Sequence, residues 1–290
     1  MRAWITFCCG FVLLWAHTLA AQSSGLRFPQ TVEAGTAFSV PTSGSGEATL
    51  YIAGPGNALR RKVQLGENVS FGAEDLHNAG HYVAVFVSGP SSQSMQFDVV
   101  PSRQPSTLSF IAKPSRLPVN LNSGISGVAY IFDVFRNLVL QPQEVSFELS
   151  DATGGTQSRS LSSQNGVAWV KMNSAAKAGP AHFNASVASV HETRVIQQVP
   201  GDPCAIRMSA RPSKDQRVLL QTEPVRDCNG NPVPDGTIVS FTETYAGLQS
   251  TVDVPLKRGV AQTELPAQSG AVISAAAGVV LGNEIHWSGR

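Results

Sequence analysis

Three oxygen-bearing side chains, those of Asp227, Asn229 and Asn231, stand at alternate positions in one short segment. This D-x-N-x-N spacing matches the start of a calcium-binding loop, because hard cations are bound by carboxylate and amide oxygens. Such a loop also needs a glycine at its sixth position and a bidentate glutamate at its twelfth, where this chain has Pro232 and Ile238. Asn and Asp in a turn ordinarily hydrogen-bond their own backbone. The segment is therefore interpreted as a structural turn, and no bound metal is predicted.

Histidine is the other residue type in this chain that could bind a metal or transfer a proton. After residue 21 the histidines are scattered singly, at His77, His81, His182, His191 and His286. Only the first two are close, and a spacing of four brings side chains together on a helix, whereas a glycine-containing turn leading into a strand is expected here. Solvated loop histidines are therefore favoured over a metal pair. The chain also lacks a G-x-S-x-G elbow, an H-E-x-x-H helix and a phosphate loop, so no catalytic residue and no cofactor are predicted.

The segment that contains Asp227 is one of two copies of a longer pattern. At a constant offset of 94 residues, six residues of the earlier copy match the later one: Asp133, Asn137, Val139, Val145, Ser146 and Phe147 stand where Asp227, Asn231, Val233, Val239, Ser240 and Phe241 stand. Six ungapped identities in fifteen residues indicate two copies of one supersecondary unit. Asp133, Asn137, Asp227 and Asn231 are accordingly predicted to form the same structural turn twice.

The later copy carries a family resemblance. The run D-x-x-G-N-P-V-x-D-G-T-x-V-x-F at 227–241, followed by G-x-A at 259–261, resembles the bacterial immunoglobulin-like domain of the invasin and intimin type. The resemblance covers about 205–290 closely, 106–200 well, and 24–100 only weakly. It implies a β-sandwich that serves as a rod segment or adhesive module at a bacterial surface.

Residues 1–21 have the organisation of a secretory signal peptide. Arg2 is followed by the apolar run Phe11-Val12-Leu13-Leu14-Trp15 and by the small residues around Ala20 and Ala21, after either of which cleavage is expected. The apolar run is shorter than the ~20 residues that a membrane-spanning helix needs. The chain is therefore predicted to be exported, to the periplasm, the cell surface or the medium, with no later membrane span.

Charge and composition exclude several classes of partner. The 21 Lys and Arg residues balance the 20 Asp and Glu residues, and no basic stripe is present. Nucleic acid and anionic membranes are therefore not expected as partners. Frequent Gly and Pro between short valine-rich runs are typical of an all-β protein.

Three antiparallel β-sandwiches in tandem are predicted, at 22–100, 106–200 and 201–290. Short alternating runs separated by Gly and Pro support the first of them. Within it, the approach to Tyr82 resembles a tyrosine corner, in which the hydroxyl bonds nearby backbone, although an ordinary core tyrosine fits the pattern equally. Two prolines mark 101–105 as a linker, and the segment Pro200-Gly201-Asp202-Pro203 marks the next boundary.

Two cysteines remain after residue 21, Cys204 and Cys228. Cys204 opens the first strand of the last unit and Cys228 lies in the repeated turn, so a sandwich brings both to the same end. Export allows an oxidised pair. Redox-active thiols are the alternative, but the chain offers no C-x-x-C motif, and a disulfide is predicted.

Trp169 is the candidate interaction residue. In the matched strands GVAWVKM and GVAQTEL it aligns with Gln262, on the face that must point outward. An exposed tryptophan is a candidate anchor for a partner. The alternative, that Trp169 covers a loop or a seam between domains, is slightly favoured.

These observations predict a non-enzymatic envelope protein with a structural, adhesive or protein-binding role. A protein or a surface polysaccharide is the expected partner. A carbohydrate- or other ligand-binding accessory protein and a periplasmic assembly factor or chaperone are the alternatives. An enzyme is not expected, because the cores of sandwiches of about 90 residues are filled by the packing of two sheets.

Overall fold

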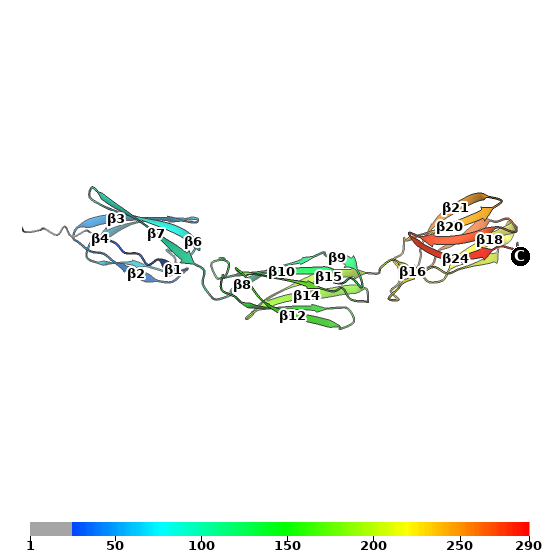
Figure 1. Cartoon of the computed structure of the whole chain (residues 1–290), viewed down its shortest axis with the longest axis horizontal. Coiled ribbons are helices and arrows are strands. Elements are labelled where there is room, and N and C mark those ends of the chain that lie inside the picture. The colour runs from blue at the N-terminus through cyan, green and yellow to red at the C-terminus, as the bar shows by residue number, and fades with distance from the viewer. Residues whose placement is uncertain (1–24, 290) are drawn as a thin grey trace, which may run out of the picture. The chain divides into compact units, whose positions relative to one another are not determined.

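The computed structural model describes residues 25–289, so the predicted signal peptide at 1–21 lies outside the described residues. The chain divides into two compact units after Val100. Strands make up nearly all regular structure, and the only helical segment within 25–289 is a short 3-10 turn, η1 (Lys214–Gln216). No helix in the described part of the chain is long and apolar enough to cross a membrane. The expected all-β fold is confirmed (Figure 1).

The first unit is a β-sandwich of a five-stranded and a two-stranded sheet. The larger sheet has the order β1 (Thr31–Glu33), β7 (Ser91–Val100), β6 (Gly80–Ser88), β3 (Glu47–Gly54) and β4 (Asn57–Gln64). The smaller sheet pairs β2 (Phe38–Pro41) with β5 (Asn68–Phe71). Strict alternation places Ala48, Leu50 and Ile52 of β3 in the core, as a half-buried strand requires.

The tyrosine corner of this sandwich is present. Tyr82 is fully buried and its hydroxyl donates a hydrogen bond of 2.9 Å to the carbonyl oxygen of Asn78. Its ring lies directly against Gly54, where a Cβ atom would come within 2.2 Å of the ring. A side chain at position 54 would therefore displace the tyrosine, which explains the glycine there.

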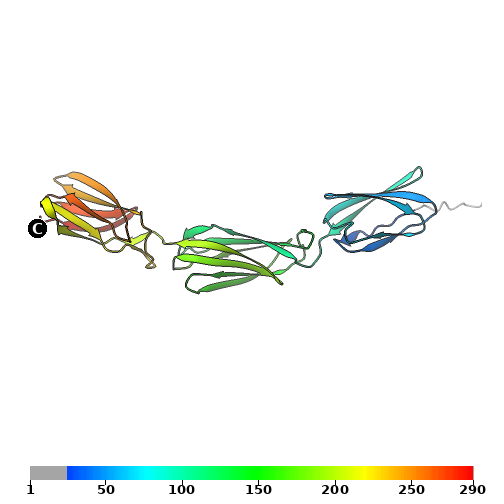
Figure 2. The same ribbon diagram turned by 180° about the vertical axis from the view of Figure 1, so that it is seen from behind.

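The second unit begins with a sandwich of eight strands, drawn in green in Figures 1 and 2. Its three-stranded sheet has the order β13 (Val167–Met172), β10 (Ile125–Phe132) and β8 (Thr107–Lys113). Its five-stranded sheet has the order β12 (Thr156–Ser162), β11 (Glu144–Ser150), β14 (Gly179–Val187), β15 (Val190–Val199) and β9 (Arg116–Pro118). Phe110, Phe147 and Phe183 pack against one another between the two sheets.

The last sandwich, coloured yellow to red in Figure 2, has its own core around Phe241 and Trp287. A four-stranded sheet has the order β21 (Leu248–Pro255), β20 (Ile238–Tyr245), β23 (Val272–Ala277) and β24 (Val280–His286). A three-stranded sheet has the order β17 (Met208–Pro212), β18 (Arg217–Thr222) and β22 (Gln262–Pro266). A further pair consists of β16 (Pro203–Ala205) and β19 (Arg226–Asp227).

The named strands pair in the expected antiparallel way except at two sheet edges. Strand β9 pairs in parallel with β15, and β1 pairs in parallel with β7. In the middle sandwich the chain changes sheets between Lys113 and Arg116. It therefore arrives beside the last strand of the opposite sheet while running in the same direction as that strand.

The predicted disulfide is present between Cys204 and Cys228, whose Cα atoms are 4.6 Å apart. It joins β16 to the turn that follows β19, and it closes a segment with a sequence separation of 24. Restricting the unfolded chain in this way stabilises the folded state.

Replacing both cysteines by serine is expected to lower the free energy of unfolding of the last sandwich by about 3 kcal/mol. Urea unfolding followed by the fluorescence of Trp287, which is buried in that core, measures the change. The wild-type chain unfolded with a reducing agent should match the double variant. Equal stability of the oxidised wild type and the double variant would contradict the prediction.

Candidate functional site

The carboxylate of Asp227 is fully occupied by N–H donors. One oxygen, Oδ1, accepts the backbone N–H groups of Asn229 at 2.9 Å and Asn231 at 2.8 Å. The other, Oδ2, accepts the backbone N–H of Gly201 at 3.0 Å and the side-chain amide of Asn231 at 2.8 Å. Burial by itself raises the pKa of Asp227, but these hydrogen bonds outweigh it and hold the pKa below its ordinary value.

The earlier copy repeats this arrangement atom for atom. Asp133 accepts the backbone N–H groups of Phe135 and Asn137 on one oxygen, and on the other the backbone N–H of Ser102 and the side-chain amide of Asn137. Arg136 adopts the left-handed backbone conformation of Gly230, with φ of 67° against 77°. The turn therefore survives replacement of its glycine, because the four hydrogen bonds fix it.

These turns do not form a cation site. A metal ion would have to displace N–H donors from both carboxylate oxygens of Asp227 or Asp133. Within residues 25–289, no group of three His, Cys, Asp or Glu side chains is placed to hold a metal. His81 contacts Asp98 at 2.8 Å on the surface, and this hydrogen bond raises the pKa of His81.

The turn at Asp227 also contacts the preceding sandwich. Asn231 Oδ1 accepts the backbone N–H of Ala178 at 2.9 Å, and Asn231 Nδ2 donates to the carbonyl oxygen of Ala176 at 2.9 Å. Lys177 donates to the carbonyl oxygen of Asn229. The same residues that shape the turn thus bind the loop after β13.

Protonation of Asp227 is expected to destabilise the last sandwich. Because the folded pKa is depressed, the contribution is complete above the ordinary carboxyl pKa, declines as the pH falls below about 4, and is absent below the folded pKa. Unfolding free energies measured from pH 7 to pH 2.5 by Trp287 fluorescence should show this loss. The Asp227→Asn variant should be less stable at pH 7 and should show a weaker dependence on pH in this range. An unchanged dependence would contradict the assignment.

The outward side of the sheet β8–β10–β13 carries the strongest candidate for a binding surface. Alternation in β13 buries Ala168, Val170 and Met172, and leaves Val167, Trp169 and Lys171 pointing outward. We call the outward residues of the three strands the Trp169 face: Val167, Trp169 and Lys171 of β13, Ser126, Val128, Tyr130 and Phe132 of β10, and Thr107, Ser109, Ile111 and Lys113 of β8.

An apolar row crosses the middle of the Trp169 face. Register pairs Val128 with Trp169 on one side and with Ile111 on the other. Trp169 is 65% exposed and Ile111 is 46% exposed. Large apolar side chains gathered on one exposed sheet face are typical of interaction surfaces.

The charge of the Trp169 face is entirely positive. The next row consists of Lys171, Ser126 and Lys113, and no residue of the face is acidic. The carboxylate of Glu192 lies at the far edge of the sheet, where it accepts the N–H of Phe110 and pairs with Arg194. The face therefore favours a partner that brings negative charge.

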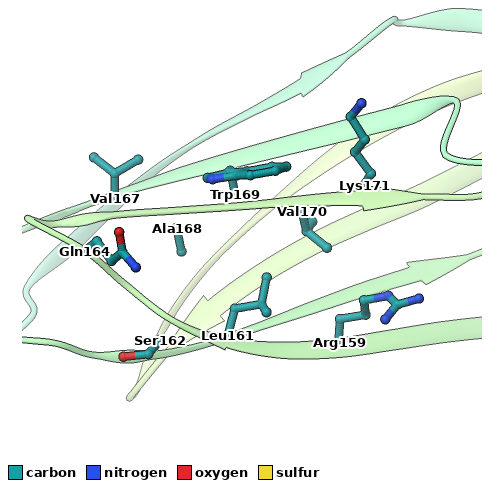
Figure 3. Close-up of a pocket in the computed structure, with 9 residues that line it drawn as sticks. All are labelled: Arg159, Leu161, Ser162, Gln164, Val167, Ala168, Trp169, Val170 and Lys171. Atoms are coloured by element: carbon teal, nitrogen blue, oxygen red, sulfur yellow. The ribbon is translucent and has the colours of Figure 1, made fainter.

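A groove of about 430 Å³ adjoins this face, between the edge strands β12 and β13. Figure 3 shows Trp169 and Lys171 on one side of β13, Val170 on the other, and Leu161 of β12 directed toward β13. Its complete lining consists of Arg159, Leu161, Ser162, Gln164, Val167, Ala168, Trp169, Val170 and Lys171.

The corresponding face of the last sandwich has a polar central row and carries an acidic residue. The row equivalent to Ile111, Val128 and Trp169 is formed by Ser209, Gln221 and Gln262. The position of Lys171 is taken by Glu264, which lies 3.7 Å from the guanidinium of Arg217 and accepts a hydrogen bond of 2.8 Å from Ser213. The two copies thus share their strand register and differ in the residues of this outward sheet face.

The sequence indicated Trp169 but not the residues that surround it. Ile111, Val128 and Lys113 come from strands far away in the chain, and only the register brings them beside it. One signal was available: the aligned strands GVAWVKM and GVAQTEL replace Lys171 by Glu264, a reversal of charge on the outward face.

No protein-family model and no curated protein matches the chain. The solved structures that resemble it include two bacterial proteins. The Escherichia coli adhesin FdeC superposes with a TM-score of 0.59 at 13% identity, covering 90% of this chain and 95% of that chain. Invasin, a bacterial integrin-binding protein, superposes with a TM-score of 0.51 at 13% identity, covering 91% of this chain and 59% of that chain.

These likenesses show the fold. The chain has the tandem immunoglobulin-like β-sandwich fold found in invasin and FdeC, and this confirms the fold expected from the repeated turn. The chain spans 59% of the invasin structure.

Proposed function

We propose that the chain is an exported, non-enzymatic immunoglobulin-like repeat protein that acts as an adhesion-type module of the cell envelope. It binds a protein or a surface polysaccharide through the Trp169 face. The disulfide between Cys204 and Cys228 supports export, because such bonds persist in oxidising compartments. The adhesins that share the fold support the class of function.

The observation that carries this proposal is the contrast between the two copies of the sheet face. Fold stability does not require Trp169, Val128 and Ile111, since the last sandwich has Gln262, Gln221 and Ser209 in their places. An exposed apolar row that the frame does not need is best explained by a partner.

The structural partners of the polar groups support a binding role over an enzymatic one. The carboxylates of Asp133 and Asp227 are saturated by N–H donors, and the ring of His81 is exposed and paired with Asp98. General acid–base chemistry needs such groups in a water-excluding cleft, within reach of a substrate.

The carbohydrate-binding alternative expects several exposed aromatic rings on one face, and the Trp169 face offers one ring that is largely exposed, that of Trp169. Tyr130 and Phe132, the other aromatic residues of the Trp169 face, are only partly exposed. The assembly-factor alternative requires an open strand edge, and β13 supplies one because, among the strands of residues 25–289, it pairs only with β10.

Replacing Trp169 by alanine is expected to weaken binding at least ten-fold, because an aromatic anchor typically contributes 2 kcal/mol or more, about a thirty-fold change in affinity. The readout is saturable binding of the labelled full-length mature chain to native envelope fractions and to immobilised matrix proteins and polysaccharides.

The matched control is Gln262→Ala at the equivalent position of the last sandwich, which should bind like the wild type. Thermal unfolding should be unchanged in both variants, since both side chains are exposed. Equal binding by Trp169→Ala and wild type, or no saturable binding by the wild type, would overturn the proposal.

A further inference from the structure

The backbone of β13 has a definite direction of hydrogen bonding. The N–H of Ile131 donates to the carbonyl oxygen of Gly166 at 2.9 Å, which sets the phase of the antiparallel pair with β10. Hydrogen-bonded and non-hydrogen-bonded pairs alternate in such a ladder. The N–H and C=O groups of Val167, Trp169, Lys171 and Asn173 therefore point away from β10, toward the groove.

Both ends of this edge are closed. Val167 exchanges two backbone hydrogen bonds with Gln164, at 2.8 and 3.0 Å. Asn173 exchanges two with the side-chain amide of Gln157, at 3.2 and 2.9 Å. Between them, the N–H and C=O groups of Trp169 and Lys171 face no strand anywhere in 25–289. Between Val167 and Asn173, the edge of β13 thus offers two backbone N–H donors and two backbone C=O acceptors.

The groove beside this opening is apolar at its floor and basic at its sides. Val145 pairs with Leu161 and Phe147 pairs with Arg159, so both β12 side chains lie on the core-facing side of their strand. The lining contains Arg159 and Lys171 and no carboxylate. Glu144 and Glu148 of β11 lie on the opposite, outward side of that sheet.

The last sandwich covers part of the equivalent edge. The carbonyl oxygen of Glu264, at the position of Lys171, accepts a hydrogen bond of 2.6 Å from the guanidinium of Arg217. Pro266 stands where Asn173 stands and has no N–H to offer. Val252 replaces Arg159, so the basic side chain is absent as well. Protection of edges against added strands is usual in β proteins, and in β13 the backbone hydrogen-bonding groups of Trp169 and Lys171 lack it.

We propose that the groove between β12 and β13 binds an extended acidic peptide segment, which adds as a further strand to β13. The peptide backbone pairs with Trp169 and Lys171, an apolar side chain of the peptide packs on Leu161, and acidic side chains meet Lys171 and Arg159. Strand addition of this kind draws affinity from backbone hydrogen bonds and specificity from alternate side chains. The inference rests on the proposed function and names its partner.

Charge and hydrogen bonding favour this occupant over two others. An anionic polysaccharide satisfies Arg159 and Lys171 but leaves the backbone donors and acceptors of β13 without strand partners. A second copy of the chain, paired edge to edge along β13, would bring the same two cations of each copy together.

The test uses an eight-residue peptide of the order V-V-E-E-V-V-E-E, which presents valine and glutamate on both faces of a strand. It is compared with its lysine counterpart, a form methylated at alternate backbone nitrogens, and polygalacturonate as an anionic polysaccharide. Binding to the full-length mature chain is measured by isothermal titration and by the fluorescence of Trp169 in a Trp287→Phe background. The glutamate peptide should bind, while the lysine and methylated forms should bind at least ten-fold more weakly.

Two variants of Lys171 separate the contribution of its side-chain charge from that of its backbone N–H. Lys171→Gln removes only the cation, whereas Lys171→Pro also removes the edge N–H, at a position where an edge strand tolerates proline. The second should bind about five-fold more weakly than the first, as expected for one hydrogen bond. Glu264→Gln in the last sandwich is the matched control and should change nothing. Circular dichroism checks that each variant is folded.

The results that would contradict strand addition can be told apart. Equal binding of the methylated peptide, or equal affinity of the two Lys171 variants, would show recognition of charge without strand addition. Tighter binding of polygalacturonate than of the glutamate peptide would indicate a polysaccharide, and dimerisation lost in Lys171→Pro would indicate a second copy. Either result overturns the inference. If no peptide binds but Trp169→Ala still loses envelope binding, the proposed function stands and strand addition fails.

Discussion

Each of the two repeated sandwiches is built on a carboxylate that receives four N–H hydrogen bonds. Asp133 and Asp227 bind the chain as it enters the sandwich, at Ser102 and Gly201, and also close the turn that precedes the central strand. Burying a carboxylate without such donors would lower the stability of the fold, and so would leaving the buried N–H groups without an acceptor. The turn is therefore specified by hydrogen bonding more than by its glycine, as Arg136 at φ of 67° demonstrates.

Because these hydrogen bonds fix the turn in both sandwiches, the residues on the outward sheet face can differ between the two copies. Gln262, Gln221 and Ser209 occupy the same places in the register as Trp169, Val128 and Ile111, yet both sheets keep the same order of strands. In the last sandwich, Arg217 and Pro266 shield part of the edge strand β22. In the middle sandwich, the edge strand β13 faces a basic groove. One template thus serves packing in both sandwiches and a surface of different chemistry in each.

The sequence carried the information about local pattern and lacked the information about register. Alternation, the matched turns and the position of Cys228 predicted the sandwiches and the disulfide, because each depends on neighbours in the chain or on the repeat. The short strands β1 and β5 gave too few residues for a pattern, and the parallel pairing of β9 depends on a change of sheet that no local signal marks. The row around Trp169 joins residues of three strands, so only the paired structure reveals it.

The position of the disulfide has a mechanical consequence for a module that is pulled from both ends. Tension that enters through Gly201 reaches Cys204 first and passes through the sulfur atoms to Cys228, so the intervening backbone carries no load. With a sequence separation of 24, about 80 Å of contour length is withheld from extension. The carboxylate of Asp227 lies inside the shielded segment, but its partners Gly201 and Asn231 lie outside it, on either side of the disulfide. Its hydrogen bonds therefore remain on the loaded path and are exposed to tension that the enclosed backbone does not carry.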